Sequence, residues 1–360
     1  MSISDTSVMS SSWRNMPPIH DAIKEKNWSA FEKLLTNSTA RDLTLSFAHF
    51  RGDELYKCSL GDEGVTALAA ALPTTTITEL TVSFCQIGPK GAAALAKALP
   101  RSQLKYLNLY GNCVGDAGAK AFAAGLAGSP ITELILVNNG ITDVGATALA
   151  RALPGATLCG RLQLGHNNLG PASAKAFAEA LAHESAPRDL DLGGNPIGAK
   201  GVEALATALA SSPVTALDLG QTGLGDKGAE ALAAALPASK LRTLRLHDNG
   251  IGTPGAEALA AAVPDSKLEV LGLGWDIGLT PGNKRIGVID RRDGTSSAFG
   301  AGDPNKMSPE IINTIQRLMR KRQQPIRLAA WREVACPAWI PAVFAVIIAM
   351  LAAPRLLGVV

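Results

Sequence analysis

The sequence contains little charge, few aromatic side chains and no paired cysteine pattern. Charged residues make up 18% of its 360 residues and aromatic residues 4%, whereas charged residues make up roughly 25% of an average soluble domain. Its five cysteines are an odd number without paired spacing, which argues against a disulfide-rich secreted fold and favours a reducing compartment. The formal net charge at pH 7 is 34 − 31 = +3, so nothing global indicates a nucleic-acid-binding protein.

The sequence also lacks the common catalytic signatures. It has no H-E-x-x-H, no G-x-S-x-G and no G-x-x-x-x-G-K-[ST] pattern, and its five histidines are scattered along the chain. The N-terminal region contains no apolar run of the kind that a cleavable signal peptide needs. We therefore expect a non-enzymatic protein with no cofactor, no metal, no nucleic-acid partner and no small-molecule substrate.

What the sequence does contain is a repeat, written L-x-L-x-x-N-x-[IL]-x-x-x-G-A-x-A-L-A-x-A-L. Its period is 27 or 28 residues, except that the first copy is about ten residues longer, and the ninth copy lacks the second half. This near-constant register makes a repeat array the main feature of the chain. The leading leucines are Leu43, Leu80, Leu107, Leu134, Leu162, Leu190, Leu217, Leu244 and Leu271.

Each repeat has two halves with different periods. Apolar residues alternate in residues 107–109, which is typical of a short half-buried strand, whereas residues 118–126 have the spacing of a helix. One repeat cannot bury its apolar face alone, so neighbouring repeats must stack. The predicted fold class is therefore α/β: a right-handed, horseshoe-shaped solenoid with parallel strands on the concave face and helices on the convex face.

The repeat resembles the leucine-rich repeat of the ribonuclease-inhibitor type. Its Gly-Ala-x-Ala-Leu-Ala block, found at residues 91–96, 145–150 and 228–233, is similar to that of the GALA subgroup, known from bacterial type III effectors delivered into plant cells. The resemblance covers residues 43–273. It implies a leucine-rich-repeat solenoid and, as an alternative function, a secreted effector that binds host proteins. The Leu-Pro start and Trp end of the F-box that GALA effectors carry are not found in this sequence.

The segments that flank the array are predicted to be caps. Residues 17–35 have the apolar spacing of an amphipathic helix, and Ser308-Pro309-Glu310 is a favourable helix start before the apolar positions of residues 311–319. The predicted domains are a Ser-rich, disordered leader (1–16), an N-terminal helical cap (17–42), the leucine-rich repeats (43–289), a loop and capping helix (290–324), a basic neck (325–333) and a hydrophobic tail (334–360).

Polar residues recur three positions after each L-x-L, and most of them are asparagine. We expect a structural ladder whose side chains satisfy backbone groups in the turn after each strand. Metal binding is the alternative for these residues. The ladder positions are Asn112, Asn139, Asn167, Asn195 and Asn249, with Cys85, Thr222 and Asp276 in other repeats.

One segment matches a nucleotide-binding pattern. Residues 223–228 spell G-x-G-x-x-G between a predicted strand and helix, and Asp248 follows twenty residues later. Other repeats place a strand, a turn and a helix in the same register without these glycines, so we attribute the pattern to the repeat. A nucleotide-binding protein or a hydrolase built on the array is the remote alternative function.

The residues between the paired leucines are predicted to point onto the concave face. Glycines 193 and 220 are expected to leave two carboxylates there accessible. The alternatives to a docking surface are an ordinary solvated face and a retaining glycosidase, whose two carboxyl groups lie about 5 Å apart. The predicted partner-binding residues are an aromatic and aliphatic patch (Tyr106, Tyr110, Ile135 and Val137) and a polar group (Asp191, Asp218, Arg245 and His247).

The tail has the length and composition of a membrane anchor. Residues 334–353 contain no charge over twenty positions, and Trp331 and Trp339 suit a membrane interface. Residues 281–333 carry 11 basic and 5 acidic side chains, whereas the first 280 residues carry 22 and 26. The sequence therefore predicts a transmembrane tail helix with the repeats facing the cytoplasm. A buried capping helix and secretion into a host cell are the alternatives.

These features predict a protein–protein interaction scaffold that is tethered to a membrane by its tail. The protein partner is expected on the concave face, and the membrane is expected to contact residues 334–353.

Overall fold

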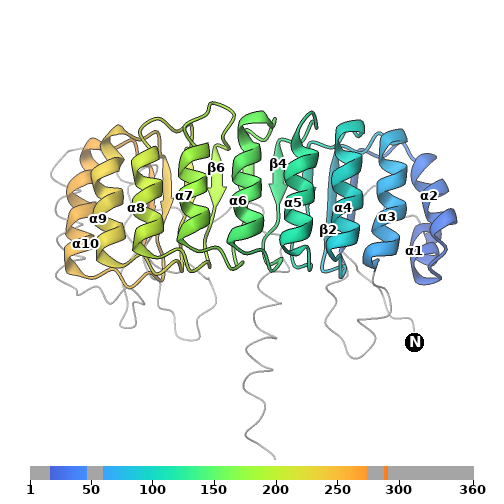
Figure 1. The fold of residues 1–360 in the computed structure, drawn as a ribbon, viewed down its shortest axis with the longest axis horizontal. Coiled ribbons are helices and arrows are strands. Elements are labelled where there is room, and N and C mark those ends of the chain that lie inside the picture. Colours follow the sequence, from blue (N-terminus) through green and yellow to red (C-terminus); the bar gives the residue numbers. More distant parts are fainter. Residues whose placement is uncertain (1–16, 47–59, 274–287, 291–360) are drawn as a thin grey trace, which may run out of the picture.

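The computed structural model describes residues 17–46, 60–273 and 288–290. Over these residues the chain forms a row of strand–helix units, with the helices side by side in front of the strands (Figure 1). The strands are β1 (Asp42–Ser46), β2 (Glu79–Ser83), β3 (Tyr106–Asn108), β4 (Glu133–Ile135), β5 (Arg161–Gln163), β6 (Asp189–Asp191), β7 (Ala216–Asp218), β8 (Thr243–Arg245), β9 (Val270–Gly272) and β10 (Val288–Asp290). The helices are α1 (Pro17–Lys24), α2 (Trp28–Thr36), α3 (Gly61–Ala71), α4 (Pro89–Ala98), α5 (Gly115–Leu126), α6 (Asp143–Ala152), α7 (Pro171–Ala180), α8 (Gly198–Ala208), α9 (Gly225–Ala235) and α10 (Thr253–Ala262).

The strands form one sheet in chain order. β1 to β9 run parallel, and β10 pairs antiparallel with β9. Parallel neighbours need a crossover connection, and α3 to α10 supply one crossover helix between each pair from β1 to β9. The leading leucines pair with one another in register, from Leu43 with Leu80 to Leu244 with Leu271. The predicted α/β repeat fold, with a parallel sheet and helices, is confirmed.

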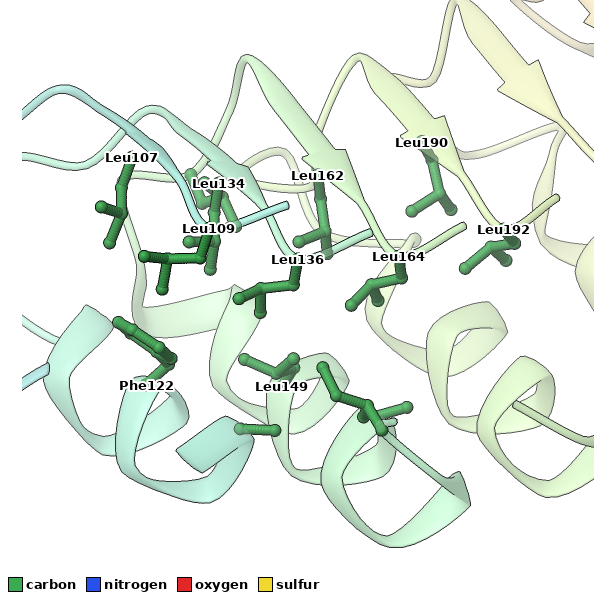
Figure 2. Packing of buried hydrophobic residues seen from close by; sticks show 14 of the residues in the cluster. Leu107, Leu109, Phe122, Leu134, Leu136, Leu149, Leu162, Leu164, Leu190 and Leu192 are labelled. Atoms are coloured by element: carbon green, nitrogen blue, oxygen red, sulfur yellow. The ribbon is translucent and has the colours of Figure 1, made fainter. Parts of the chain in front are cut away.

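The core lies between the sheet and the row of helices. Leu107 and Leu109 point from the sheet toward the helices and are fully buried, and the same pair of leucines recurs in the neighbouring repeats (Figure 2). Phe122 on α5 and Leu149 on α6 meet them from the helical side. Because burying one such side chain contributes about 1.5–3 kcal/mol, the repeats stabilise one another through one continuous core.

The N-terminal edge of the core is covered by two short helices, whereas the sequence predicted one helix over residues 17–35. The chain turns between α1 and α2, where Lys26 has a φ of 53° and the side chain of Asn27 accepts a hydrogen bond from the Ala30 amide. These two features end α1 and start α2. Phe31 and Leu35 are buried, and α2 packs against α3.

At the other end, the described part of the chain closes with β10. The predicted capping helix around residues 308–319, the neck and the tail at residues 334–353 lie outside the described residues. Among the described residues, none of the helices has both the length and the apolar character needed to cross a bilayer.

Candidate functional site

The predicted ladder asparagines lie buried in the turns that follow the strands. The Nδ2 of Asn167 donates to the carbonyls of Leu136 and Leu164, both at 2.9 Å. Its Oδ1 accepts from the amides of Asn139 and Ile141 at 2.9 and 3.0 Å. One amide side chain therefore joins its own repeat to the preceding repeat. The other described ladder positions are Cys85, Asn112, Asn139, Asn195, Thr222 and Asn249, which are also buried; Asp276 lies outside the described residues.

A second ladder consists of aspartates, which sequence reasoning missed. Asp116 in α5 accepts hydrogen bonds from the Thr142 amide at 2.8 Å, the Thr142 hydroxyl at 2.6 Å and the Gly145 amide at 3.0 Å. The amides at the start of α6 have no partner within their own helix, so the aspartate of one repeat caps the helix of the next. The signal in the sequence is an aspartate at the start of the helical half. Asp62, Asp143 and Asp226 likewise each accept from two backbone amides at the starts of α4, α7 and α10.

The predicted aromatic residues lie on the sheet face turned away from the helices, which we call the open face. Tyr106 and Tyr110 alternate with leucines that point into the core, and both are half-buried. The ring of Tyr110 packs edge-on against Phe84 with 4.9 Å between ring centroids. The hydroxyl of Tyr106 accepts from Asn108 Nδ2 at 3.2 Å, and burial raises the pKa of Tyr106. Phe84 and Tyr110 are therefore in contact, and Tyr106 lies on the same face four residues earlier. We call these three partly exposed rings the aromatic cluster.

The aliphatic part of the predicted patch is buried, so it does not offer the binding surface that the sequence predicted. Ile135 is only 7% exposed and Val137 only 9% exposed. Ile135 lies in register between Asn108 on β3 and Gln163 on β5, and strands are only about 4.8 Å apart. The longer side chains of Asn108 and Gln163 thus leave little of Ile135 for a partner, and the exposed part of the patch is aromatic.

The predicted polar residues lie in register on three neighbouring strands. Asp191 on β6 pairs with Asp218 on β7, which pairs with Arg245 on β8. Each aspartate accepts a hydrogen bond at 2.9 Å from the amide two residues further along, that of Gly193 or Gly220. Arg245 Nη1 lies 3.7 Å from Asp218 Oδ2, which is an ion pair longer than a hydrogen bond. The structure therefore brings the polar residues together as one row.

The carboxylates are less open than expected, because they lean over the glycines instead of standing clear of them. The two oxygens of Asp191 lie over Gly165, and Oδ1 of Asp218 lies over Gly193. The imidazole of His247 lies over Gly220. A carboxylate in this position keeps part of its surface against the sheet. The expectation of two freely accessible carboxylates is corrected to two half-buried ones.

The environment of the row changes its protonation. Burial and the neighbouring Asp218 carboxylate raise the pKa of Asp191 to about 8, against the opposing effects of the Gly193 amide and Arg245. Burial also lowers the pKa of His166, which follows β5, and His247 acts in the same direction while Asp218 opposes it. At neutral pH the row therefore carries less negative charge than its two carboxyl groups suggest.

A second charged row crosses the open face two residues earlier in each strand. Arg161 on β5 lies between Glu133 on β4 and Asp189 on β6. Its guanidinium is 3.6 Å from Glu133 Oε2 and donates to Asp189 Oδ2 at 2.9 Å. Sequence reasoning missed this row because it considered only the mid-strand positions and those two residues later.

The G-x-G-x-x-G segment has a structural explanation in the turn before α9. Gly223 and Gly225 have φ values of 70° and 57°, a left-handed conformation that glycine adopts at little cost. Asp226, within the segment, caps α10 through the amides of Gly252 and Gly255. Within the described residues, no group of three or more His, Cys, Asp or Glu side chains is arranged to hold a metal ion.

Several solved structures match part of this chain. The actin-binding site 2 of leiomodin-1 is 23% identical with a TM-score of 0.34, and the match covers 38% of this chain and 80% of that one. An internalin (inlF) from Listeria monocytogenes is 20% identical with a TM-score of 0.38, over 57% of this chain and 49% of that one. A chain of the Rad7 and Elc1 complex from yeast is 12% identical with a TM-score of 0.41, over 65% of this chain and 64% of that one. The chain thus spans about half the length of the internalin.

The sequence also matches a family model described as Leucine Rich repeat. The match consists of six stretches, at residues 75–96, 103–123, 129–150, 188–206, 210–233 and 238–260. No curated protein matches the sequence. The matched stretches fall on the strand–helix units, and the leucines of these units pair across one parallel sheet. The chain is a leucine-rich repeat protein.

Proposed function

We propose that this chain is a non-enzymatic scaffold that binds a protein partner through the open face of β3 to β8. The observation that carries the proposal is that an aromatic cluster and a charged row lie on the same face of one sheet. Tyr106 begins β3 and Tyr110 follows it, and the carboxyl pair begins on β6, three strands away. At about 4.8 Å per strand this distance is about 14 Å. One extended segment of a partner can reach both.

The charges of the face indicate the chemistry of the partner. Arg161 is paired with Glu133 and Asp189, and Arg245 faces Asp218. Asp191 has only Gln163 and Asp218 as its in-register neighbours. A basic side chain on the partner complements this part of the face, and an aromatic or aliphatic one complements the tyrosines. We therefore propose a partner segment that carries both.

Selection of short peptides tests this proposal. Random peptides displayed on phage are selected on the full chain, and we expect enrichment of sequences that combine a basic and an aromatic residue. The affinity of a selected peptide should fall about tenfold or more in the Asp191→Asn, Asp218→Asn double variant. The Tyr106→Ala, Tyr110→Ala double variant should show a comparable loss.

The matched control is the Glu203→Gln, Glu230→Gln double variant, which removes two exposed carboxylates from α8 and α9. It should bind as the parent chain does. A selected peptide that keeps its affinity in both open-face variants, or that loses it in the control, would show that the open face is not the docking surface.

Two finer features of the proposal come from the sequence. The Gly-Ala-x-Ala-Leu-Ala blocks support membership of the ribonuclease-inhibitor type and its GALA subgroup, and with it the alternative that the chain is a secreted bacterial effector that binds host proteins. The uncharged residues 334–353 behind a basic segment support a membrane anchor with the repeats in the cytoplasm. Deleting residues 1–16, the Ser-rich leader, should abolish export only in the effector case.

A further inference from the structure

Three glycines each lie two residues past the end of one of three neighbouring strands, β5, β6 and β7. We call them the glycine lane: Gly165, Gly193 and Gly220. A Cβ atom at Gly165 would lie 2.9 Å from Oδ2 of Asp191, and one at Gly193 would lie 3.1 Å from Oδ1 of Asp218. A Cβ atom at Gly220 would lie 2.0 Å from the ring of His247. Each of these polar side chains therefore occupies the space that the preceding strand leaves empty.

The lane places the two carboxyl groups close to one point. Oδ1 of Asp191 and Oδ1 of Asp218 lie 3.3 and 3.1 Å from the Cβ position of Gly193. Each of these oxygens is also tied to its own strand by an amide hydrogen bond of 2.9 Å. Two features thus keep the carboxyl groups near each other. The backbone amides bind them, and the glycines leave the space that they occupy.

The other charged groups around the pair do not neutralise both carboxylates. Arg245 lies on β8, beside Asp218 and two strands from Asp191. Asp189, on the same strand as Asp191, adds a further negative charge that Arg161 pairs. His166 and His247 are the remaining titratable neighbours. Two adjacent, partly buried carboxylates repel each other, which favours a state in which they hold one proton between them.

We propose that the glycine lane is the positioning element of the partner site: it holds the Asp191 and Asp218 carboxyl groups side by side, so that the pair keeps one proton until a basic group of the partner displaces that proton into solvent. The first step is the positioning of the two carboxyl groups around one proton, and the second is the displacement of that proton by the partner. Only the second step rests on the proposed function. The raised pKa of Asp191, caused by burial and by Asp218, agrees with the first step.

Aspartate titration in the full chain tests the positioning. With ¹³C-labelled aspartate, the carboxyl carbon of Asp191 in the parent chain should titrate near pH 8. In Gly165→Ala the new methyl group displaces the carboxylate, which is the flexible end of its side chain, toward solvent. The titration midpoint of Asp191 should then fall by about one pH unit or more. Gly155→Ala is the matched control, because a Cβ atom there has nothing within 4 Å, and it should leave the midpoint unchanged.

Two results would overturn the positioning inference: an ordinary aspartate midpoint for Asp191 in the parent chain, or the same raised midpoint in Gly165→Ala. Asp218→Asn provides a second test that leaves the lane intact. The substitution removes the charge beside Asp191, while the side-chain oxygen of the new asparagine can still accept from the Gly220 amide. The variant should also lower the titration midpoint of Asp191. An unchanged midpoint in this variant would show that the carboxyl groups do not share a proton.

Binding of a selected basic–aromatic peptide tests the second step. Its affinity for the parent chain should rise between about pH 6 and pH 9 as the proton is lost, and it should depend less on pH in Gly165→Ala. An affinity that does not depend on pH would overturn proton displacement. Failure to obtain any peptide that requires the open face would contradict the proposed function instead, and the titration would still decide the positioning.

Discussion

Single asparagine side chains connect neighbouring repeats of this protein, through the amide nitrogen as donor and the amide oxygen as acceptor. Asn167 donates to the carbonyls of Leu136, Leu164 and Gly165 and accepts from two amides, and all five partners are backbone groups. A residue of this kind carries no information about a ligand, because its hydrogen-bonding capacity is already used by the fold. The open-face aspartates differ from it in lying beside a like charge.

Replacing Asn167 with Leu should lower the free energy of unfolding by about 1–3 kcal/mol, because five backbone groups lose a buried hydrogen-bond partner. Asn168→Leu is the control. Its side chain is exposed, and the change should stay within about 0.5 kcal/mol. Urea unfolding followed by circular dichroism measures both. Equal midpoints for the two variants would contradict the structural role of the ladder.

Asp191 should make the stability of the protein depend on pH. Its folded-state pKa of about 8 lies above that of the unfolded chain, so the folded state binds the extra proton between the two values. The contribution of Asp191 to stability should therefore fall as the pH rises from about 4 to 8, by at most about 1.4 kcal/mol per pH unit. The free energy of unfolding of Asp191→Asn, relative to the parent, should therefore rise between about pH 4 and pH 8 and stay constant at higher pH.

Denaturant melts at a series of pH values measure that difference. Glu230→Gln, at an exposed carboxylate of α9, should follow the parent chain at every pH. If Asp191→Asn also follows the parent, the carboxyl group of Asp191 is not perturbed in the folded protein.

At the scale of elements, each helix start depends on the preceding repeat. Asp116 belongs to α5 but hydrogen-bonds to the first residues of α6. Burial acts to raise the pKa of Asp116, but the hydrogen bonds from Thr142 and Gly145 outweigh it, so the net pKa lies below the ordinary value. The helices are thus joined by a charge as well as by apolar contacts.

Asp116→Ala should lower stability at neutral pH by about 0.5–2 kcal/mol, the range measured for lost helix caps. Because the folded-state pKa is lowered, this contribution is present above about pH 4 and is lost as the pH falls through the folded-state value. The difference between Asp116→Ala and the parent should therefore shrink in acid. Thermal melts at neutral and acid pH measure it, with Glu230→Ala, which lies outside any cap, as the control. A difference that persists unchanged in acid would rule out the ionic cap.

At the scale of the whole molecule, each repeat contacts its neighbours on either side. The sheet follows chain order without exception over the described residues, and successive helices from α3 to α10 pack against each other. Stability in such an array is close to a sum of repeats and their interfaces. The open face can therefore be altered at one pair of strands while distant repeats stay folded.

The tail prediction concerns residues 334–353, which lie outside the described residues. We expect the full chain to remain with membranes after alkaline carbonate extraction. A chain that ends at Gln324 should be found in the supernatant, folded. Val346→Asp with Ile348→Asp should weaken insertion, because a charge at the centre of a membrane helix costs about 2.5–3.5 kcal/mol. Full-length chain in the supernatant would refute the anchor, and an aggregating truncated chain would favour a tail that covers the array.

The repeat period, the alternation of strand and helix and the positions of the paired leucines could be predicted from the sequence. These features depend on residues within one repeat, whose spacing reflects the geometry of a strand or a helix directly. The same reasoning placed Asn167 in a ladder and the polar row on the open face. It also assigned the glycines at 223 and 225 to the repeat, where their left-handed φ values agree with a turn.

Only the tertiary structure decided what surrounds each of these residues. The burial of Ile135 and Val137, the capping of α6 by Asp116 and the leaning of Asp191 over Gly165 all involve residues from two different repeats. Such neighbours are about one repeat apart in the sequence, and no local pattern in the sequence predicts that they are in contact. Burial and charge act over a few ångströms in space, so the protonation of Asp191 and the room left by the glycine lane follow from the stacking of strands rather than from any one strand.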